Sequence, residues 1–145
     1  MILNILAVGD VVGEGGLDIL SRRLDGLRQE TQANFVVVNG ENASGVGITP
    51  AQARRILEAG ADVITLGNHT WNRIQIADFL EDDRYTLRPA NYTSRVPGRG
   101  WGVYDGPGPA RLQIDHEAVD GPVGHPHHHV THLDHQPHPS TLHIA

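Results

Sequence analysis

The sequence predicts an α/β fold in which a parallel sheet is covered by helices. Apolar runs of strand length alternate with amphipathic stretches through the first 80 or so residues. The connections between them are short, and each of the first three runs ends at a glycine followed by a polar residue. This alternation predicts the order βαβαβα, with right-handed crossovers that bring the carboxyl ends of the strands to one edge of the sheet.

The chain opens with an apolar run over residues 2–9 that stops at Gly9-Asp10, as expected of a buried strand that leads into a loop. An amphipathic helix follows from Leu17 onward, because apolar residues recur there at steps of three and four. The residues of this apolar stripe are Leu17, Leu20, Leu24 and Leu27.

Two further strands are predicted from β-branched runs. Residues 35–38 form the second strand, which ends by Glu41 in a glycine-rich loop. Residues 62–66 form the third strand, and Asn72 is a candidate N-cap for a third helix that runs through Leu80.

The second helix has start and stop signals of its own. Thr49 is a suitable N-cap, Pro50 suits the first helical position, and Gln52 stands three residues after the cap, as in a capping box. Gly60 is well placed to end the helix. These signals predict a helix over residues 50–59.

The last third of the chain differs in composition, because it holds seven of the nine prolines and nine of the ten histidines. Residues 101–104 and 110–114 predict two short strands around a Gly/Pro turn. Residues 115–145 lack the apolar residues needed for packing. We therefore expect the N-terminal part of a domain over residues 1–114 and a disordered His/Pro-rich tail over residues 115–145.

Length and composition limit the class of protein. The 145 residues suit one domain, and the absence of cysteine leaves only Asp, Glu, Asn and His as metal ligands, which suits a reducing cytoplasm. The apolar N-terminus is too short for a signal peptide or a membrane span, so we expect a soluble, unexported protein. A net charge of −6 argues against a duplex nucleic-acid surface but allows a small anionic substrate at a metal.

Three motifs at strand ends carry the chemistry: Gly9-Asp10, Gly40-Glu41-Asn42 and Gly67-Asn68-His69. Each motif taken alone is also a common turn. In a parallel sheet, however, all three would meet at one edge and bring two carboxylates, two carboxamides and an imidazole together. Their conjunction predicts a metal centre with oxygen and nitrogen ligands.

These motifs lie in longer segments that resemble the YmdB-type branch of the calcineurin-like metallophosphoesterases, over residues 1 to about 104. In ordinary calcineurin-like enzymes the first motif is Asp-x-His and the second is Gly-Asp. This chain has Val12 in place of that histidine and Glu41 in place of the second aspartate, and both differences are typical of the branch. The carrying segments are Val8–Gly13, Val38–Ala43, Gly60–Trp71 and Arg88–Tyr92.

The resemblance implies a calcineurin-like α/β sandwich and a metal-dependent phosphodiesterase, with 2′,3′-cyclic nucleotides as substrates and two divalent ions, iron or manganese, as cofactors. Asp10 would bind one metal, Glu41 would bridge both, Asn68 would bind the second, and Asn42 would lie at the first. A hydroxide held between the metals would attack phosphorus. His69 would protonate the departing oxygen or, alternatively, only orient a neighbouring ligand.

The resemblance also predicts what is different here. The family's domain is longer, and its second half supplies histidines from His-Ala-Glu and Gly-Thr-His-Thr-His segments that are not found in residues 1–145. With few ligands left, an alternative function is a catalytically impaired relative that acts only in metal binding or interaction, with its His-rich tail collecting ions. Another account of the tail is a change of coding frame near Gln113 or Ile114.

Without the second half, the sheet would expose an edge and an apolar face. This predicts marginal stability or pairing with another copy of the chain as a homo-oligomer.

Overall fold

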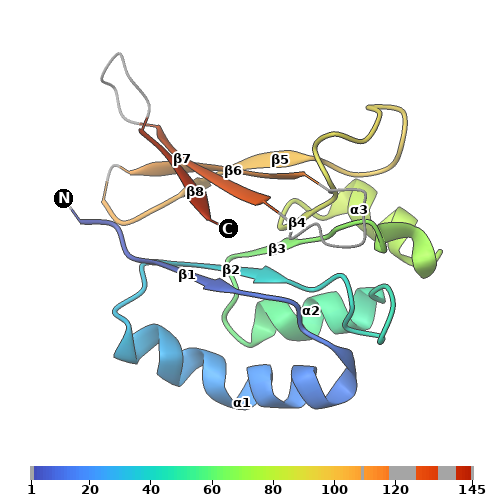
Figure 1. The fold of residues 1–145 in the computed structure, drawn as a ribbon, viewed down its shortest axis with the longest axis horizontal. Helices are drawn as coiled ribbons and strands as arrows, with labels where there is room; N and C mark the ends of the chain where they lie inside the picture. The colour runs from blue at the N-terminus through green and yellow to red at the C-terminus, as the bar shows by residue number, and fades with distance from the viewer. Residues whose placement is uncertain (1, 109, 118–126, 134–139, 145) are drawn as a thin grey trace.

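The computed structural model describes residues 2–108, 110–117, 127–133 and 140–144 (Figure 1). A parallel four-stranded sheet has the order β1-β2-β3-β4. Its strands are β1 (Ile5–Val8), β2 (Phe35–Asn39), β3 (Val63–Thr65) and β4 (Thr86–Leu87). The first three strands and their order confirm the predicted fold class. The two-residue β4 was not predicted, because it is too short to show any periodicity.

Helices cover one face of this sheet. The helical segments are α1 (Gly13–Glu30), α2 (Pro50–Glu58), the 3₁₀ turn η1 (Thr70–Asn72) and α3 (Ile76–Asp82). Figure 1 shows α1 and α2 side by side beneath the parallel sheet. Because each new strand is added on the same side of the previous one and crossovers of this kind are right-handed, the two connecting helices lie on the same face of the sheet. None of the described helices has the length and apolar character needed to cross a membrane.

The predicted start of the third helix is wrong. Gln75, not Asn72, is the N-cap residue of α3, and its side chain forms no capping hydrogen bond. The amides of Thr70 and Asn72 donate instead to the carbonyls of Gly67 and His69, three residues back. These bonds close a separate 3₁₀ turn directly after β3.

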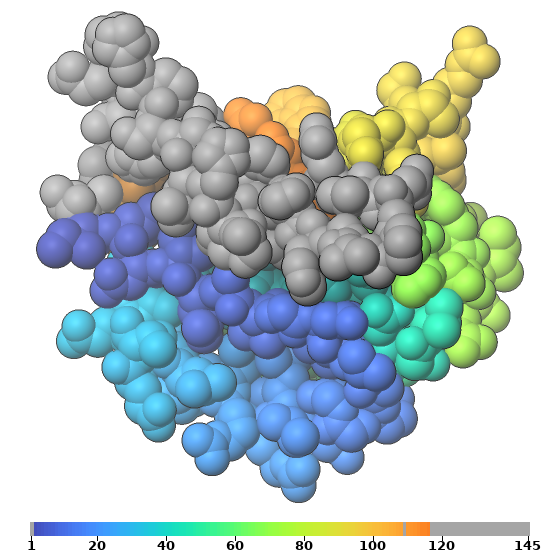
Figure 2. All heavy atoms as spheres, in the orientation of Figure 1, coloured from blue at the N-terminus to red at the C-terminus, as the bar shows by residue number. Residues whose placement is uncertain are grey.

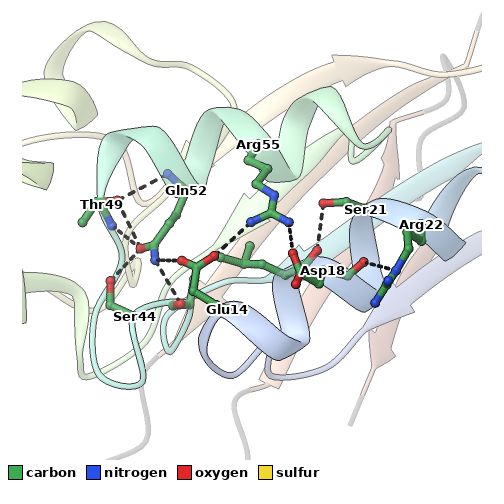
Figure 3. Close-up of polar contacts among 10 residues, drawn as sticks. Glu14, Asp18, Ser21, Arg22, Ser44, Thr49, Gln52 and Arg55 are labelled. Carbon is green, nitrogen blue, oxygen red and sulfur yellow. Dashed lines mark hydrogen bonds and ion pairs between the residues drawn. The ribbon is translucent and has the colours of Figure 1, made fainter.

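The predicted limits of α2 are confirmed. The Thr49 hydroxyl accepts a hydrogen bond from the Gln52 amide at 3.3 Å, and the Gln52 side chain accepts one from the Thr49 amide at 3.0 Å. Figure 3 shows this capping box at the start of the helix. At the other end, Gly60 has a φ of 112°, a conformation that side chains disfavour.

Polar side chains join α2 to α1 across the helical layer (Figure 3). The Glu14 carboxylate accepts hydrogen bonds from Gln52 and Arg55, each at 3.0 Å, and Arg55 also pairs with Asp18. The hydrogen bond from Arg55 lowers the pKa of Asp18 below its usual value. These groups lie at the surface, so they orient the two helices more than they stabilise the fold.

An antiparallel sheet, with strand order β5-β6-β7-β8, forms the third layer. Its strands are β5 (Trp101–Asp105), β6 (Arg111–Glu117), β7 (His127–Leu133) and β8 (Ser140–Ile144). The first two confirm the predicted short strands. Strands β7 and β8 lie within the stretch predicted as a tail, and they pair through backbone groups that any non-proline sequence offers.

The rest of the predicted tail, residues 118–126 and 134–139, lies outside the described residues. Strand β6 crosses the predicted boundary after residue 114. The division of the chain into a domain and a tail therefore stays a prediction.

Alternating residues of β2 face two different cores. Val36 and Val38 belong to the cluster beneath the helices, whereas Phe35 and Val37 belong to a second cluster with Leu112 of β6. The parallel sheet is therefore packed on both faces, as Figure 1 shows. The predicted exposure of an apolar sheet face is wrong, because side chains of β5 and β6 cover it. Strand β1 does form an edge of the parallel sheet.

Candidate metal centre

The three predicted motifs meet at the carboxyl edge of the parallel sheet. The register pairs Val8 with Val38 and Asn39 with Thr65, so β1, β2 and β3 end at nearly the same level. Backbone bonds continue past the strands, from the Val11 amide to the Asn39 carbonyl at 3.0 Å. Loops that carry Asp10, Glu41-Asn42 and Asn68-His69 thus start from one edge, which lies on the right in Figure 1.

A chain of hydrogen bonds links one residue from each motif. The Asn42 amide nitrogen donates to Asp10 Oδ1 at 2.8 Å, and the Asn42 side-chain oxygen lies 2.7 Å from His69 Nδ1. A carboxylate only accepts hydrogen bonds, so Asn42 must turn its NH₂ group toward Asp10 and its oxygen toward His69. The imidazole therefore carries a proton on Nδ1, and Nε2 faces no hydrogen-bonding partner among the described residues.

Glu41 lies at the centre of this edge, and only 8% of its surface is exposed. One of its carboxylate oxygens accepts a hydrogen bond from the His69 amide at 3.2 Å. A Cβ atom at Gly67 would lie 2.3 Å from that same oxygen, so the carboxylate occupies space that only a glycine leaves open. A buried carboxylate is costly without a counter-charge, which makes this position suitable for a cation.

The other two predicted metal ligands are placed differently. Asn68 is exposed and forms no side-chain hydrogen bond within the part of the chain that the structure describes. Both polar ends of the Asn42 carboxamide are used, by Asp10 and by His69. Asn42 is thus placed to orient its two neighbours, and its role as a metal ligand stays a prediction.

Sequence reasoning missed two residues beside this centre. Asn39 is 1% exposed, and its side-chain oxygen accepts a hydrogen bond from the Glu41 amide at 3.4 Å. The Tyr92 hydroxyl donates to the Gly67 carbonyl at 3.5 Å. A polar residue that closes the apolar run of β2 was a usable signal for Asn39, whereas the contact of Tyr92 arises only from tertiary folding.

Comparison with known proteins adds to this geometry. The sequence profile of the family described as YmdB-like protein matches residues 6–117, which include every residue of the candidate centre. The chain belongs to the YmdB-like family. The resemblance inferred from the strand-end motifs is thereby confirmed.

Individual proteins and solved structures are similar to this chain over part of their length. A 2′,3′-cyclic-nucleotide 2′-phosphodiesterase from Bacillus subtilis is 40% identical over 99 residues, which cover 68% of this chain and 38% of the relative. A crystal structure titled a novel phosphatase, from Mycoplasma pneumoniae, has a TM-score of 0.70 and 28% identity. The match covers 78% of this chain and 42% of the Mycoplasma chain. The crystal structure of a hypothetical protein from Thermus thermophilus has a TM-score of 0.68 and 33% identity. The match covers 75% of this chain and 42% of the Thermus chain. The chain thus spans about two fifths of the length of these proteins.

The residues at this edge suit the divalent metals that the family resemblance implies. Asp10, Glu41 and Asn68 offer hard oxygen atoms, the donors preferred by ions such as Mn²⁺. Within the described residues, however, no group of three or more His, Cys, Asp or Glu side chains is arranged to hold a metal. The donor type fits, and the small number of donors leaves positions for water or further ligands.

Proposed function

We propose that this chain carries part of the active site of a metal-dependent phosphodiesterase. The observation behind the proposal is the hydrogen-bonded chain Asp10–Asn42–His69 next to the buried Glu41 carboxylate, all at one sheet edge. The relative named 2′,3′-cyclic-nucleotide 2′-phosphodiesterase and the structure titled a phosphatase support this class of reaction. A 2′,3′-cyclic nucleotide is accordingly the proposed substrate.

Asp10, Glu41 and Asn68 would hold two divalent ions, with iron or manganese as the proposed metals. Glu41 is the residue suited to lie between them, because it stands centrally and is the most buried of the three. When bound, such ions activate water and neutralise the charge of the phosphoryl oxygens. The chain's own contribution is to hold the Asp10 carboxylate through the Asn42 side chain and to keep the Glu41 carboxylate buried.

His69 is proposed as the general acid. Its Nδ1–H is held by the Asn42 oxygen, and this leaves Nε2 as the atom that exchanges a proton with the substrate. As the phosphorus–oxygen bond to the leaving group breaks, a protonated Nε2 would give its proton to the departing oxygen. Asn42 fixes the ring orientation, and its own orientation is fixed in turn by Asp10.

The proposal is tested by hydrolysis of bis-p-nitrophenyl phosphate with Mn²⁺. We expect turnover by the 145-residue chain that disappears in the Asp10→Asn, Glu41→Gln double variant. The control is Asp25→Asn, an exposed carboxylate on α1 whose partner is Gln29 on the same helix. Activity no higher in the unaltered chain than in the double variant would overturn the proposal for this chain.

A second candidate follows from the small number of described ligands: metal binding without turnover. Calorimetry with Mn²⁺ distinguishes the two. Binding that requires Asp10 and Glu41, in a chain that shows no phosphodiesterase activity, would support a catalytically impaired relative. Binding that is unchanged in the double variant would count against a metal centre at Asp10 and Glu41, and would favour the alternative in which the His-rich tail collects the ions.

A further inference from the structure

A cavity of about 760 Å³ lies beyond the carboxyl end of β4, the strand that pairs with β3. It is bounded by the end of α3, the connection from β4 to β5, and the start of β5. In Figure 1 this connection lies beside α3, on the same side of the molecule as the metal-centre loops, and in Figure 2 its yellow atoms stand out at the surface. Tyr92 joins the two sites, because it lines the cavity and its hydroxyl contacts the Gly67 carbonyl.

The cavity is positively charged although the chain as a whole has a net charge of −6. Three arginines line it, Arg84, Arg88 and Arg99, against the single carboxylate of Asp82. The buried Arg88 is held in place, because its guanidinium donates to the carbonyls of Pro97 at 3.2 Å and Pro89 at 2.9 Å.

The other two arginines are exposed and available to a ligand. Arg84 lies over the ring of Tyr85, with 5.4 Å between its guanidinium carbon and the ring centroid. The Arg99 guanidinium donates to the Asp83 carbonyl at 3.5 Å. Neither forms an ion pair with a carboxylate within the described residues. Two such guanidinium groups suit an anion with several oxygens, such as a phosphate.

Trp101 adds a flat aromatic surface to the same cavity. It is 58% exposed, which is unusual for the largest apolar side chain, and it lies at the start of β5. An exposed indole beside arginines is a typical stacking surface for a nucleobase. The volume also lies within the range of pockets that take small organic ligands.

We propose that this cavity binds a nucleotide, with its base on Trp101 and its phosphate at Arg84 and Arg99. The proposal extends the proposed function, on which it rests for the reaction at the neighbouring metal centre. The phosphate in the cavity is then a second one, distinct from the phosphate that is cleaved. The preferred substrate class is therefore a nucleotide that carries a 5′-phosphate in addition to the scissile phosphodiester.

Calorimetry with 5′-AMP tests this proposal in EDTA, so that the metal centre takes no part. We expect one saturable site, with adenosine and inorganic phosphate each bound at least tenfold more weakly. The Arg84→Gln, Arg99→Gln double variant should lose at least tenfold in affinity for 5′-AMP, and Trp101→Ala should lose affinity for it as well. The Arg22→Gln, Arg23→Gln double variant is the charge-matched control, because both arginines are exposed on α1 and Arg22 donates to the Asp18 carbonyl of the same helix.

Three results would overturn the proposal: no binding of 5′-AMP, equal binding of adenosine or phosphate, or unchanged binding by the double variant. Asp10→Asn should leave the affinity for 5′-AMP unchanged while abolishing phosphodiesterase activity. Loss of 5′-AMP binding in Asp10→Asn would also count against it, because the nucleotide would then be bound at the metal centre. Failure of the phosphodiesterase assay with intact 5′-AMP binding would instead reject the proposed reaction alone.

Discussion

The absence of a side chain at position 67 shapes the candidate metal centre. Gly67 ends the third apolar strand, and the Glu41 carboxylate fills the space where a Cβ atom would lie. The same residue offers its carbonyl to Thr70 and to Tyr92. One glycine therefore allows the close approach of two strand-end loops on which the centre depends.

Gly67→Ala is expected to displace the Glu41 carboxylate, because the new methyl group would lie 2.3 Å from one of its oxygens. We expect the affinity for Mn²⁺ to fall by about tenfold or more, the range seen when supporting groups of a metal site are lost. Calorimetry measures this. Gly9→Ala is the matched control, since a Cβ at Gly9 meets nothing within 4 Å. Equal affinities for the two variants would contradict the role assigned to Gly67.

Tyr104 is expected to make stability sensitive to alkaline pH. Burial raises the pKa of its hydroxyl above the usual value of 10.0, and the hydroxyl donates to the Arg84 carbonyl at 2.7 Å. Above about pH 10 the unfolded chain loses this proton while the folded chain keeps it, so the free energy of unfolding should fall as pH rises. The chain has no lysine, so few other groups titrate there.

The measurement for Tyr104 is urea unfolding between about pH 8 and about pH 11, on either side of the ordinary tyrosine pKa. Tyr104→Phe should be less stable at the lower pH by about 1 kcal/mol, for one lost hydrogen bond. It should also show a weaker decline toward the higher pH. A decline as steep as that of the unaltered chain would show that the pH dependence arises at other groups.

Single elements combine local signals with contacts to their neighbours. The start of α2 was predictable because the capping box uses residues only three positions apart. The same Gln52 side chain also reaches Glu14 of α1, a contact across 38 positions of sequence that no local pattern shows. Gln52 thus contributes both to the start of α2 and to its orientation against α1, but only the start could be predicted from the sequence.

Thr49→Ala is expected to lower the free energy of unfolding by about 1 kcal/mol, through loss of the acceptor that caps the Gln52 amide. Thermal or urea unfolding followed by circular dichroism measures the change. Thr31→Ala serves as the control, because the exposed Thr31 hydroxyl bonds to Leu27 within the last turn of α1. A loss of equal size in both variants would argue against a specific capping role for Thr49.

The whole molecule depends on the packing of one sheet against the other. Leu112 and Ile114 of β6 and Tyr104 of β5 meet Phe35 and Val37 of β2, and all five side chains are buried. This inter-sheet core covers the face that was expected to lie open. It also positions the β4–β5 connection, with its cavity, next to the metal-centre loops.

Leu112→Ala is expected to destabilise the protein by about 2 to 5 kcal/mol, the cost of a cavity in a buried core. Ile74→Ala, at a residue that is 74% exposed, should change stability by less than about 0.5 kcal/mol. Urea unfolding compares the two. A small effect at Leu112 would show that the antiparallel sheet contributes little to the folded state in solution.

The sequence alone determined the βαβαβα order, the limits of α2, the family, and the motifs at Asp10, Glu41 and Asn68. These features depend on local periodicity, capping and short motifs, which act between residues near in sequence. Tertiary structure decided the pairing of β7 and β8, the two contacts of Asn42, the space at Gly67 and the arginine-lined cavity. The contacts of Asn42 and the space at Gly67 join groups far apart in the chain. The pairing of β7 with β8 and the cavity join segments nearer in sequence, but no local pattern shows them, because their packing and hydrogen bonds exist only once the chain has folded.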